Sequence, residues 1–272
     1  MSGGGHRPFF LESSTTQTIV AWIGIVANCI NVTFGVVWIW RHETLISLNY
    51  YALAVDILVG LFLADIFSGF VHWATDTWFD ELSGGRVIAI AREHHLYPQH
   101  IVGYGFADYV AYSSWPTLLV FGPMSLGCAI FVGASPLSLN IVAVCTLVSF
   151  VMLFGTYAHR LGHQKVDSKL VILLQRANLL MSPQHHMVHH RDNHDIRYCV
   201  VNGWANIVCD RIGFWRFLEQ VVYSVTGAVP RAHDHLCFSR FRNDRSFVTK
   251  VWWGYGPKLE KTSLSSTHEQ RV

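Results

Sequence analysis

Residues 48–76 read LNYYALAVDILVGLFLADIFSGFVHWATD, an apolar run of helical length that ends in a histidine and an aspartate. A helix needs about 20 residues to cross the apolar core of a bilayer. Residues 48–70 meet that length, and His72 and Asp76 continue the same helix one turn apart. The stretch therefore predicts a membrane-spanning helix that carries potential metal ligands at one end.

Three further apolar runs are long enough to cross a bilayer, at residues 18–40, 109–132 and 137–158. Hydrophobic residues make up 51% of the chain and charged residues 14%, which is too little charge for an ordinary soluble domain. The net charge of +2 gives no reason to expect a nucleic-acid partner. The composition predicts an all-α integral membrane protein with four transmembrane helices.

The distribution of basic residues predicts how the four helices are oriented. An even number of spans places both termini and the 72–108 loop on one side of the membrane. Of the 20 lysines and arginines, 16 follow the fourth apolar run, and Arg41 alone falls on the opposite side. Basic residues concentrate on the cytosolic side. We therefore expect cytosolic termini and a cytosolic, histidine-rich helical cap on the membrane helices.

The chain divides into a cytosolic tail at 1–17, a four-span domain at 18–234 and a second tail at 235–272. The second tail lacks hydrophobic periodicity towards its end, which is typical of disorder. Residues 168–181 resemble a helix lying in the membrane interface. The pattern of residues 206–223 predicts one helix, which lies either in the membrane interface or packed within the cap.

Most of the 16 histidines fall in short clusters: VHWATD at 71–76, REHH at 92–95, HRLGH at 159–163 and QHHMVHH at 184–190. Residues four apart lie on one face of a helix, so their side chains reach a common metal ion. The predicted ligands are His72, Asp76, His94, His95, His159, His163, His185, His186, His189 and His190. All of these except Asp76 and His185 also form the predicted catalytic set.

Two further residues are expected to support the ligands rather than bind metal. Asp65 lies inside an apolar span, where an ionised carboxylate needs a partner. We expect it to accept the second ring N–H of a ligand histidine. His194 follows the last cluster closely and is assigned the same supporting role.

The number and type of these ligands indicate two metal ions. About nine nitrogen and oxygen donors exceed the four of a structural zinc site, and the sequence has no Cys-x-x-Cys pair. Imidazole and carboxylate suit iron, zinc, copper or nickel, so the ligand set alone does not select the metal. A redox metal that uses O₂ would oxidise a lipid chain, whereas zinc would activate water.

Several motifs in order resemble those of the plasmanylethanolamine desaturase family, which includes the bacterial CarF proteins and a plant plastid palmitate desaturase. They are LADIFSGFVHWATDTW, REHHLYP, GTYAHRLGH and LMSPQHHMVHHRDNHDIRYCVVNGWAN, followed by IGFWRFLEQVVYSVTGAVPRAHD, and they cover roughly residues 50–234. The first box departs from the broader acyl desaturases, because Asp76 stands where they have histidine. Assignment of each histidine to one ion therefore does not transfer from them.

The resemblance implies a di-iron enzyme of the endoplasmic reticulum membrane with its active site in the cytosol. It would use O₂ and electrons from cytochrome b5 to introduce a vinyl-ether double bond into the O-alkyl chain of plasmanylethanolamine. Three alternatives remain open: a desaturase or hydroxylase of phospholipid acyl chains, a membrane metal transporter or sensor, and a zinc-dependent membrane hydrolase. Arg191 and Arg197 are candidates for holding the lipid phosphate, although the sequence favours solvated positions for both.

Overall fold

The computed structural model describes residues 13–42, 50–79, 85–191 and 194–232, and every regular element in these ranges is a helix. Residues 1–12 of the first predicted tail and the whole second tail at 235–272 lie outside the described residues. In chain order the elements are α1 (Thr15–His42), α2 (Tyr50–Thr77), α3 (Gly85–Leu96), the 3₁₀ helix η1 (Pro98–Gly103), α4 (Phe106–Gly127), the π-helix η2 (Cys128–Val132), α5 (Pro136–Leu161), α6 (Lys169–Arg176), α7 (Pro183–His186), α8 (Trp204–Arg211) and α9 (Phe214–Thr226).

Four of these elements are long and apolar enough to cross a membrane: α1, α2, α4 with η2, and α5. They coincide with the four predicted spans and extend most of them by a few residues. The extension of α2 to Thr77 places His72 and Asp76 on the spanning helix itself. The prediction of an all-helical fold with four long apolar helices is confirmed.

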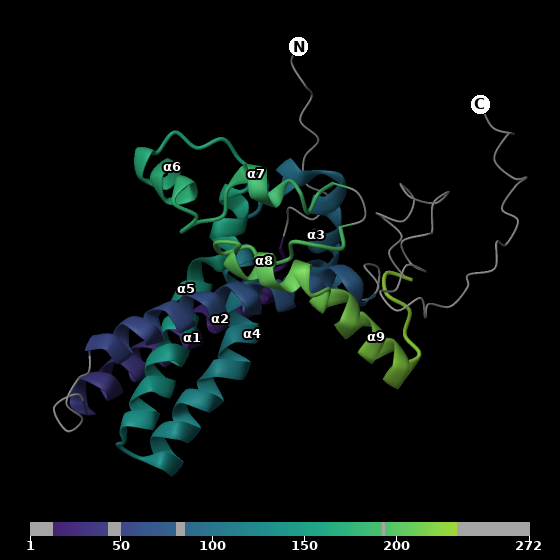
Figure 1. The fold of residues 1–272 in the computed structure, drawn as a ribbon. Coiled ribbons are helices and arrows are strands. Elements are labelled where there is room, and N and C mark those ends of the chain that lie inside the picture. The colour runs from purple at the N-terminus through teal and green to yellow at the C-terminus, as the bar shows by residue number, and fades with distance from the viewer. Residues whose placement is uncertain (1–12, 43–49, 80–84, 192–193, 233–272) are drawn as a thin grey trace, which may run out of the picture.

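The four long helices form a bundle in which α5 is the central member (Figure 1). It contacts α1, α2 and α4. Within its most apolar 18-residue segment 44% is buried, compared with 22–28% in the corresponding segments of the other three helices. Polar contacts add to this packing, since the Asn28 amide donates to the Ser149 carbonyl at 3.2 Å. Hydrogen bonds of this kind help to hold helices together where lipid removes the hydrophobic driving force.

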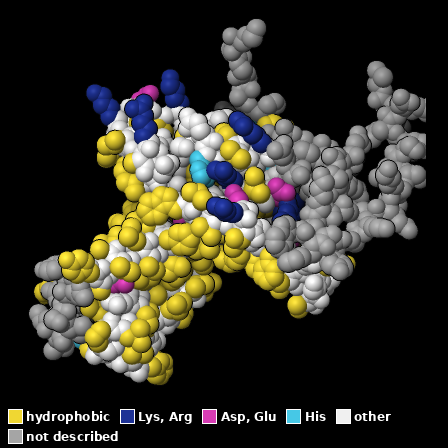
Figure 2. Space-filling view, viewed as in Figure 1, with side chains coloured by type: hydrophobic (Ala, Val, Ile, Leu, Met, Phe, Trp, Pro, Cys, Tyr) yellow, Lys and Arg dark blue, Asp and Glu magenta, His cyan; other side chains and the backbone are white. Residues whose placement is uncertain are grey.

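The remaining helices form a cap over one end of the bundle, with α9 projecting from it beside the bundle (Figure 1). A cluster of aromatic residues fixes the cap to α2, because Trp73 of α2 packs against Trp215 of α9 and near Tyr198. Figure 2 shows apolar side chains covering the bundle, while the lysines and arginines gather on the cap. This division is the one expected for a bundle in lipid beneath a cap in water.

The helix predicted at 206–223 is wrong, because the chain forms two helices there. Gly213 has φ +67°, a left-handed conformation that favours glycine, and it separates α8 from α9. Three exposed apolar residues, Phe217, Val221 and Val225, follow one another at four-residue intervals along α9. The element predicted at 168–181 is also shorter than expected, because α6 ends at Arg176.

Candidate metal centre

Four helical segments bring the predicted ligands to the junction of the bundle and the cap. The end of α2 carries His72 and Asp76, α3 carries His94 and His95, and the end of α5 carries His159 and His163. The last three histidines, at 186, 189 and 190, come from α7 and the turn that follows it. Ser182 caps α7 by accepting from the His185 amide, which starts this helical turn where the ligands are needed.

Five histidines form one group of ligand atoms that all lie within 4.8 Å of one another; we call this the five-histidine group. Its members are His94, His159, His163, His186 and His190. The Nε2 atom of His186 lies 2.9 Å from that of His159, 2.8 Å from that of His163 and 3.1 Å from that of His190. Four imidazoles therefore point the same nitrogen at one small volume.

A second group combines three histidines with a carboxylate; we call this the carboxylate group. Its members are His72, Asp76, His95 and His189. The Asp76 Oδ2 atom lies 3.0 Å from the Nε2 of His72, 3.1 Å from that of His95 and 3.4 Å from that of His189. One carboxylate oxygen thus faces three imidazole nitrogens.

The two groups are neighbours. The ring centroids of His72 and His159 are 5.0 Å apart, and those of the adjacent residues His94 and His95 are 4.5 Å apart although the two side chains join different groups. Together the groups contain nine of the ten predicted ligands. The geometry is that of two adjacent binding positions rather than one large site.

Backbone carbonyls orient several of these rings. The Nδ1 of His72 lies 2.9 Å from the Tyr198 carbonyl, that of His189 lies 2.7 Å from the Ile196 carbonyl, and that of His94 lies 2.5 Å from the Ala91 carbonyl. A carbonyl can only accept, so each ring donates its Nδ1–H and keeps the Nε2 lone pair available. This arrangement of the second ring nitrogen is the usual one for a metal-bound histidine.

Burial keeps most histidines of the five-histidine group neutral. Burial lowers the pKa of His94 to about 3 and lowers the pKa of His163, His186 and His190 well below the ordinary value. Clustered buried lone pairs and a carboxylate are unfavourable without a cation to share them. The donor set therefore fits two metal ions, one for each group. A metal in the five-histidine group need not displace protons from its rings at neutral pH.

Comparison with known proteins identifies the type of protein that carries this centre. A family model described as a lipid desaturase domain matches residues 61–233, a segment that contains all nine grouped ligands. The chain belongs to the lipid desaturase family. The resemblance expected from the sequence motifs is confirmed.

Several proteins similar to the desaturase are themselves named as desaturases. It is 31% identical to plasmanylethanolamine desaturase 1 of Mus musculus over 72% of this chain and 71% of the relative. It is 30% identical to the plasmanylethanolamine desaturase of Myxococcus xanthus over 65% of this chain and 63% of the relative. It is 36% identical to the chloroplastic fatty acid desaturase 4-like 2 of Arabidopsis thaliana over 64% of this chain and 61% of the relative. No solved structure matches the chain.

These relationships make the desaturase an oxidoreductase that acts on lipids. They exclude the two alternatives from other classes, a metal transporter or sensor and a zinc-dependent hydrolase. The family assignment does not distinguish an ether-lipid substrate from an acyl-lipid substrate.

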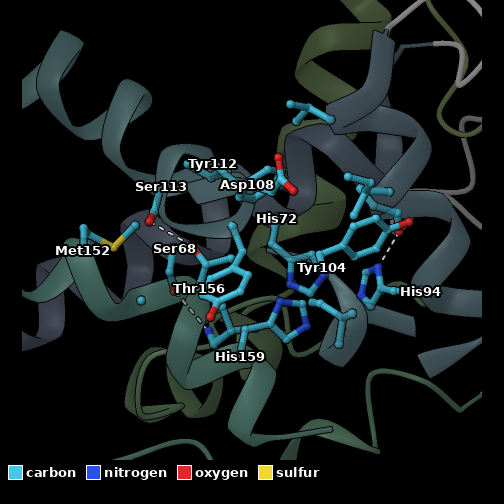
Figure 3. Close-up of a pocket in the computed structure, with 18 of the residues that line it drawn as sticks. Ser68, His72, His94, Tyr104, Asp108, Tyr112, Ser113, Met152, Thr156 and His159 are labelled. Atoms are coloured by element: carbon cyan, nitrogen blue, oxygen red, sulfur yellow. Dashed lines mark hydrogen bonds between the residues drawn. The ribbon is translucent and has the colours of Figure 1, made fainter. Parts of the chain in front are cut away.

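A pocket with about 750 Å³ of empty space, part of it open to the outside, leads to the metal centre of the desaturase. It lies between α2, α3, α4 and α5, and three ligands from both groups line it: His72, His94 and His159. Figure 3 shows their side chains together at one side of the pocket, with Asp108 on the other side in this view. Apolar residues such as Ile90 and Met152 contribute most of the remaining surface.

His185 is the predicted ligand that joins neither group. Its Nε2 atom lies 3.1 Å from the Asn206 amide nitrogen and 3.2 Å from Nη1 of Arg197. Successive residues of a helix point about 100° apart, so His185 faces α8 while His186 faces the metals. The ring also lies against Gly203, where an added Cβ would be 2.8 Å from Nε2. The prediction that His185 binds metal is not supported by this position.

Asp65 has partners other than the one predicted. Its Oδ1 accepts from the amides of Val201, Asn202 and Gly203 at 3.0–3.1 Å, and its Oδ2 accepts from the Ala205 amide at 2.9 Å. The expected hydrogen bond from a ligand histidine is therefore wrong. Asp65 instead anchors the segment before α8 to the membrane helix α2. The same segment supplies the Tyr198 carbonyl that orients His72.

His194 lies beside the carboxylate group. Its ring stacks on His95 with centroids 4.2 Å apart and an angle of 17°, and burial lowers its pKa to about 2. The neutral ring packs against a candidate ligand, and its supporting role stays a prediction.

Sequence reasoning missed a buried ionic network beneath the carboxylate group. Arg231 donates to Glu219 at 2.8 Å and lies at hydrogen-bond distance from the Tyr198 hydroxyl, 2.5 Å away. Glu219 is 2% exposed and Arg231 is 4% exposed. The available signal was Glu219 itself, the one acidic residue in the stretch IGFWRFLEQVV.

Proposed function

We propose that the chain is a plasmanylethanolamine desaturase that forms the vinyl-ether double bond of a plasmalogen. The observation that carries the proposal is the pocket, because it runs between apolar helices and begins at ligands of both groups. A chain that enters from the membrane would meet the centre without crossing water. Two relatives with this activity in their names add support.

The metal ions proposed for the two groups are iron. Bound iron would supply the reduction of O₂ that oxidation of unactivated C–H bonds requires. The reaction balances when two adjacent CH₂ groups become CH=CH while O₂, two electrons and two protons become two molecules of water. Cytochrome b5 is the proposed electron donor, and the basic cytosolic cap is a suitable surface for an acidic protein.

The residues of the chain would position the substrate and exclude water. Val71, Ile90, Ile101 and Met152 give the pocket an apolar wall that favours an alkyl chain over solvent. The reacting carbons would then lie beside His72, His94 and His159, which would bind the two ions. Fixing a chain at one depth determines which two carbons react.

The proposed location is the endoplasmic reticulum membrane, with the metal centre and both termini in the cytosol. The basic residues of the cap support this orientation through the preference of lysine and arginine for the cytosolic side. The position of the centre at one end of the bundle, rather than at its midplane, agrees with access from that side.

Expression in plasmalogen-deficient cells tests the function. We expect vinyl-ether lipids to appear in cells that make the wild-type chain and to be absent in cells that make His186→Ala at equal abundance in the membrane. Lipid mass spectrometry after mild acid hydrolysis measures the product, because vinyl ethers are acid-labile. Wild-type protein that is folded and in the membrane but yields no vinyl ether would refute the proposal.

The second candidate is a desaturase of phospholipid acyl chains. The specific observation in its favour is the 36% identity to a relative named as a fatty acid desaturase. The same lipid analysis separates the two, since new double bonds in ester-linked chains, without vinyl ethers, would indicate this activity.

A further inference from the structure

An ion pair that is not part of the metal ligand set lies in the wall of the substrate pocket. Arg86, in the first turn of α3, meets Asp108, in the first turn of α4, through Nη1–Oδ1 and Nη2–Oδ2 distances of 2.6 and 3.1 Å. Both side chains line the pocket and keep about 15% exposure. Among the described residues that line this pocket, leaving the histidines aside, these two alone carry a full charge at neutral pH.

The pair lies where a lipid headgroup would be. The α4 helix enters the apolar bundle at this point, and the neighbouring side chains Val87 and Phe106 are 48% and 52% exposed. Apolar residues that remain exposed beside charged ones are typical of the boundary between lipid and water. A phospholipid in the pocket would therefore have its polar part near Arg86 and Asp108 and its chain among the helices.

The proposed reaction requires headgroup contacts close to the metals. The carbons that become the vinyl ether are the first two of the alkyl chain, so only the ether oxygen and the glycerol backbone separate them from the phosphate. A site that holds these carbons beside His72, His94 and His159 must hold the phosphate in the same pocket. The charged pair satisfies this requirement from within the pocket lining.

We propose that Arg86 and Asp108 recognise the zwitterionic phosphoethanolamine headgroup, a proposal that rests on the function proposed above. The pair opens on binding, the Arg86 guanidinium takes the phosphate and the Asp108 carboxylate takes the primary ammonium. A guanidinium matches two phosphate oxygens, and a primary ammonium has three N–H donors for a carboxylate. In the complex, each charged side chain of the pair therefore faces an opposite charge of the headgroup.

The surroundings disfavour a trimethylammonium headgroup. A quaternary ammonium has no N–H to donate and is usually bound against aromatic faces. Arg86 lies over the ring of Tyr104 at 5.5 Å from its centroid, and Arg160 lies over the ring of Tyr109 at 5.3 Å. Guanidinium groups thus already cover a face of each of these two tyrosines. Ser13 donates to Asp108 Oδ1 at 2.7 Å and helps to orient the carboxylate.

Three 1-alkyl-2-acyl glycerophospholipids with ethanolamine, choline or glycerol headgroups test the proposal in proteoliposomes. We expect wild type to prefer the ethanolamine lipid and Asp108→Asn to reduce its kcat/KM at least about tenfold, mainly through KM, with little effect on the other two. Arg86→Gln should raise KM for all three lipids, because each has a phosphate. Asp210→Asn is the matched control, since Asp210 pairs with Arg197 outside the pocket.

The charge swap Arg86→Asp with Asp108→Arg separates recognition from structural support. A merely structural pair would be restored by the swap, so recovery of both thermal stability and ethanolamine preference would overturn the proposal. We expect recovery of stability alone. An unchanged ratio of ethanolamine to choline turnover in Asp108→Asn would also overturn it.

Native mass spectrometry of lipid binding makes the result independent of turnover. Wild type that retains the ethanolamine lipid over the choline lipid, with Asp108→Asn losing that preference, supports the headgroup site even if no vinyl ether forms. Failure of vinyl-ether formation then counts against the proposed function alone. Equal retention of the two lipids by wild type counts against the headgroup site alone.

Discussion

The five-histidine group and the carboxylate group lie side by side but are built differently. In the carboxylate group, Asp76 supplies a negative charge, and the carbonyls of Tyr198 and Ile196 fix His72 and His189. In the five-histidine group, the Nδ1 atoms of His163, His186 and His190 are buried without a hydrogen-bond partner among the described residues. One group is organised by the protein before metal binds, whereas the other depends more on the metal itself.

Asp76→Asn should have the largest effect, because it removes the charge that distinguishes the two groups. We expect the metal content to fall by about one ion per chain. Turnover should fall by more than about 100-fold, since even loss of a ligand's outer partner costs 10–100-fold. Metal analysis and activity of the purified variant measure both, with the exposed Asp167→Asn as the control. Two retained ions would show that the carboxylate is not needed to hold the second one.

Asp65→Asn should weaken the backbone support of the carboxylate group. The amide nitrogen of asparagine cannot accept from a backbone N–H, so at least one of four buried donors loses its partner. We expect a loss of about 3 kcal/mol in the free energy of unfolding, or roughly 5–10 °C in Tm. Thermal unfolding in detergent measures this loss. A Tm within a degree of wild type would contradict the anchoring role of Asp65.

Acid should destabilise the metal-free chain, mainly through the five-histidine group. The pKa of an unfolded histidine is about 6.5, whereas burial lowers the pKa of His94 to about 3 in the fold. The unfolded state therefore binds more protons between these values, so stability is present above pH 6.5 and is lost as pH falls towards 3. Tm measured from pH 7.5 to pH 5 after chelation should decrease steadily. A constant Tm would show that these rings are not buried as neutral groups.

His185→Gln should have the smallest effect and define the edge of the five-histidine group. Glutamine keeps a polar group for Asn206 and Arg197, and His185 reaches neither group of ligands. We expect metal content to stay the same and turnover to stay within about twofold of wild type. The neighbouring His186→Gln serves as the contrast. Loss of a metal ion in His185→Gln would return this residue to the ligand set.

The sequence predicted the four long helices and most ligands because both follow local rules. Length and hydrophobicity define a span, and i, i+4 spacing pairs His159 with His163 and His72 with Asp76. The break at Gly213 was missed because helix-forming residues continue on both sides of it, and only the backbone conformation of the glycine separates α8 from α9.

Contacts between distant segments could not be predicted in the same way. The sequence correctly required a partner for Asp65, yet that partner is a set of amides more than 130 residues away. His94 and His95 are adjacent in sequence but enter different groups, because neighbouring side chains on a helix point in different directions. The pairing of Arg86 with Asp108 depends on how α3 packs beside α4, which spacing along the chain does not encode.

The number of metal ions bound to the active, full-length chain tests the central claim most directly. Metal analysis of protein purified from the membrane, alongside its lipid desaturation activity, should give two iron ions per chain, one for each group. Full activity with a single ion per chain, or with zinc in place of iron, would contradict the account.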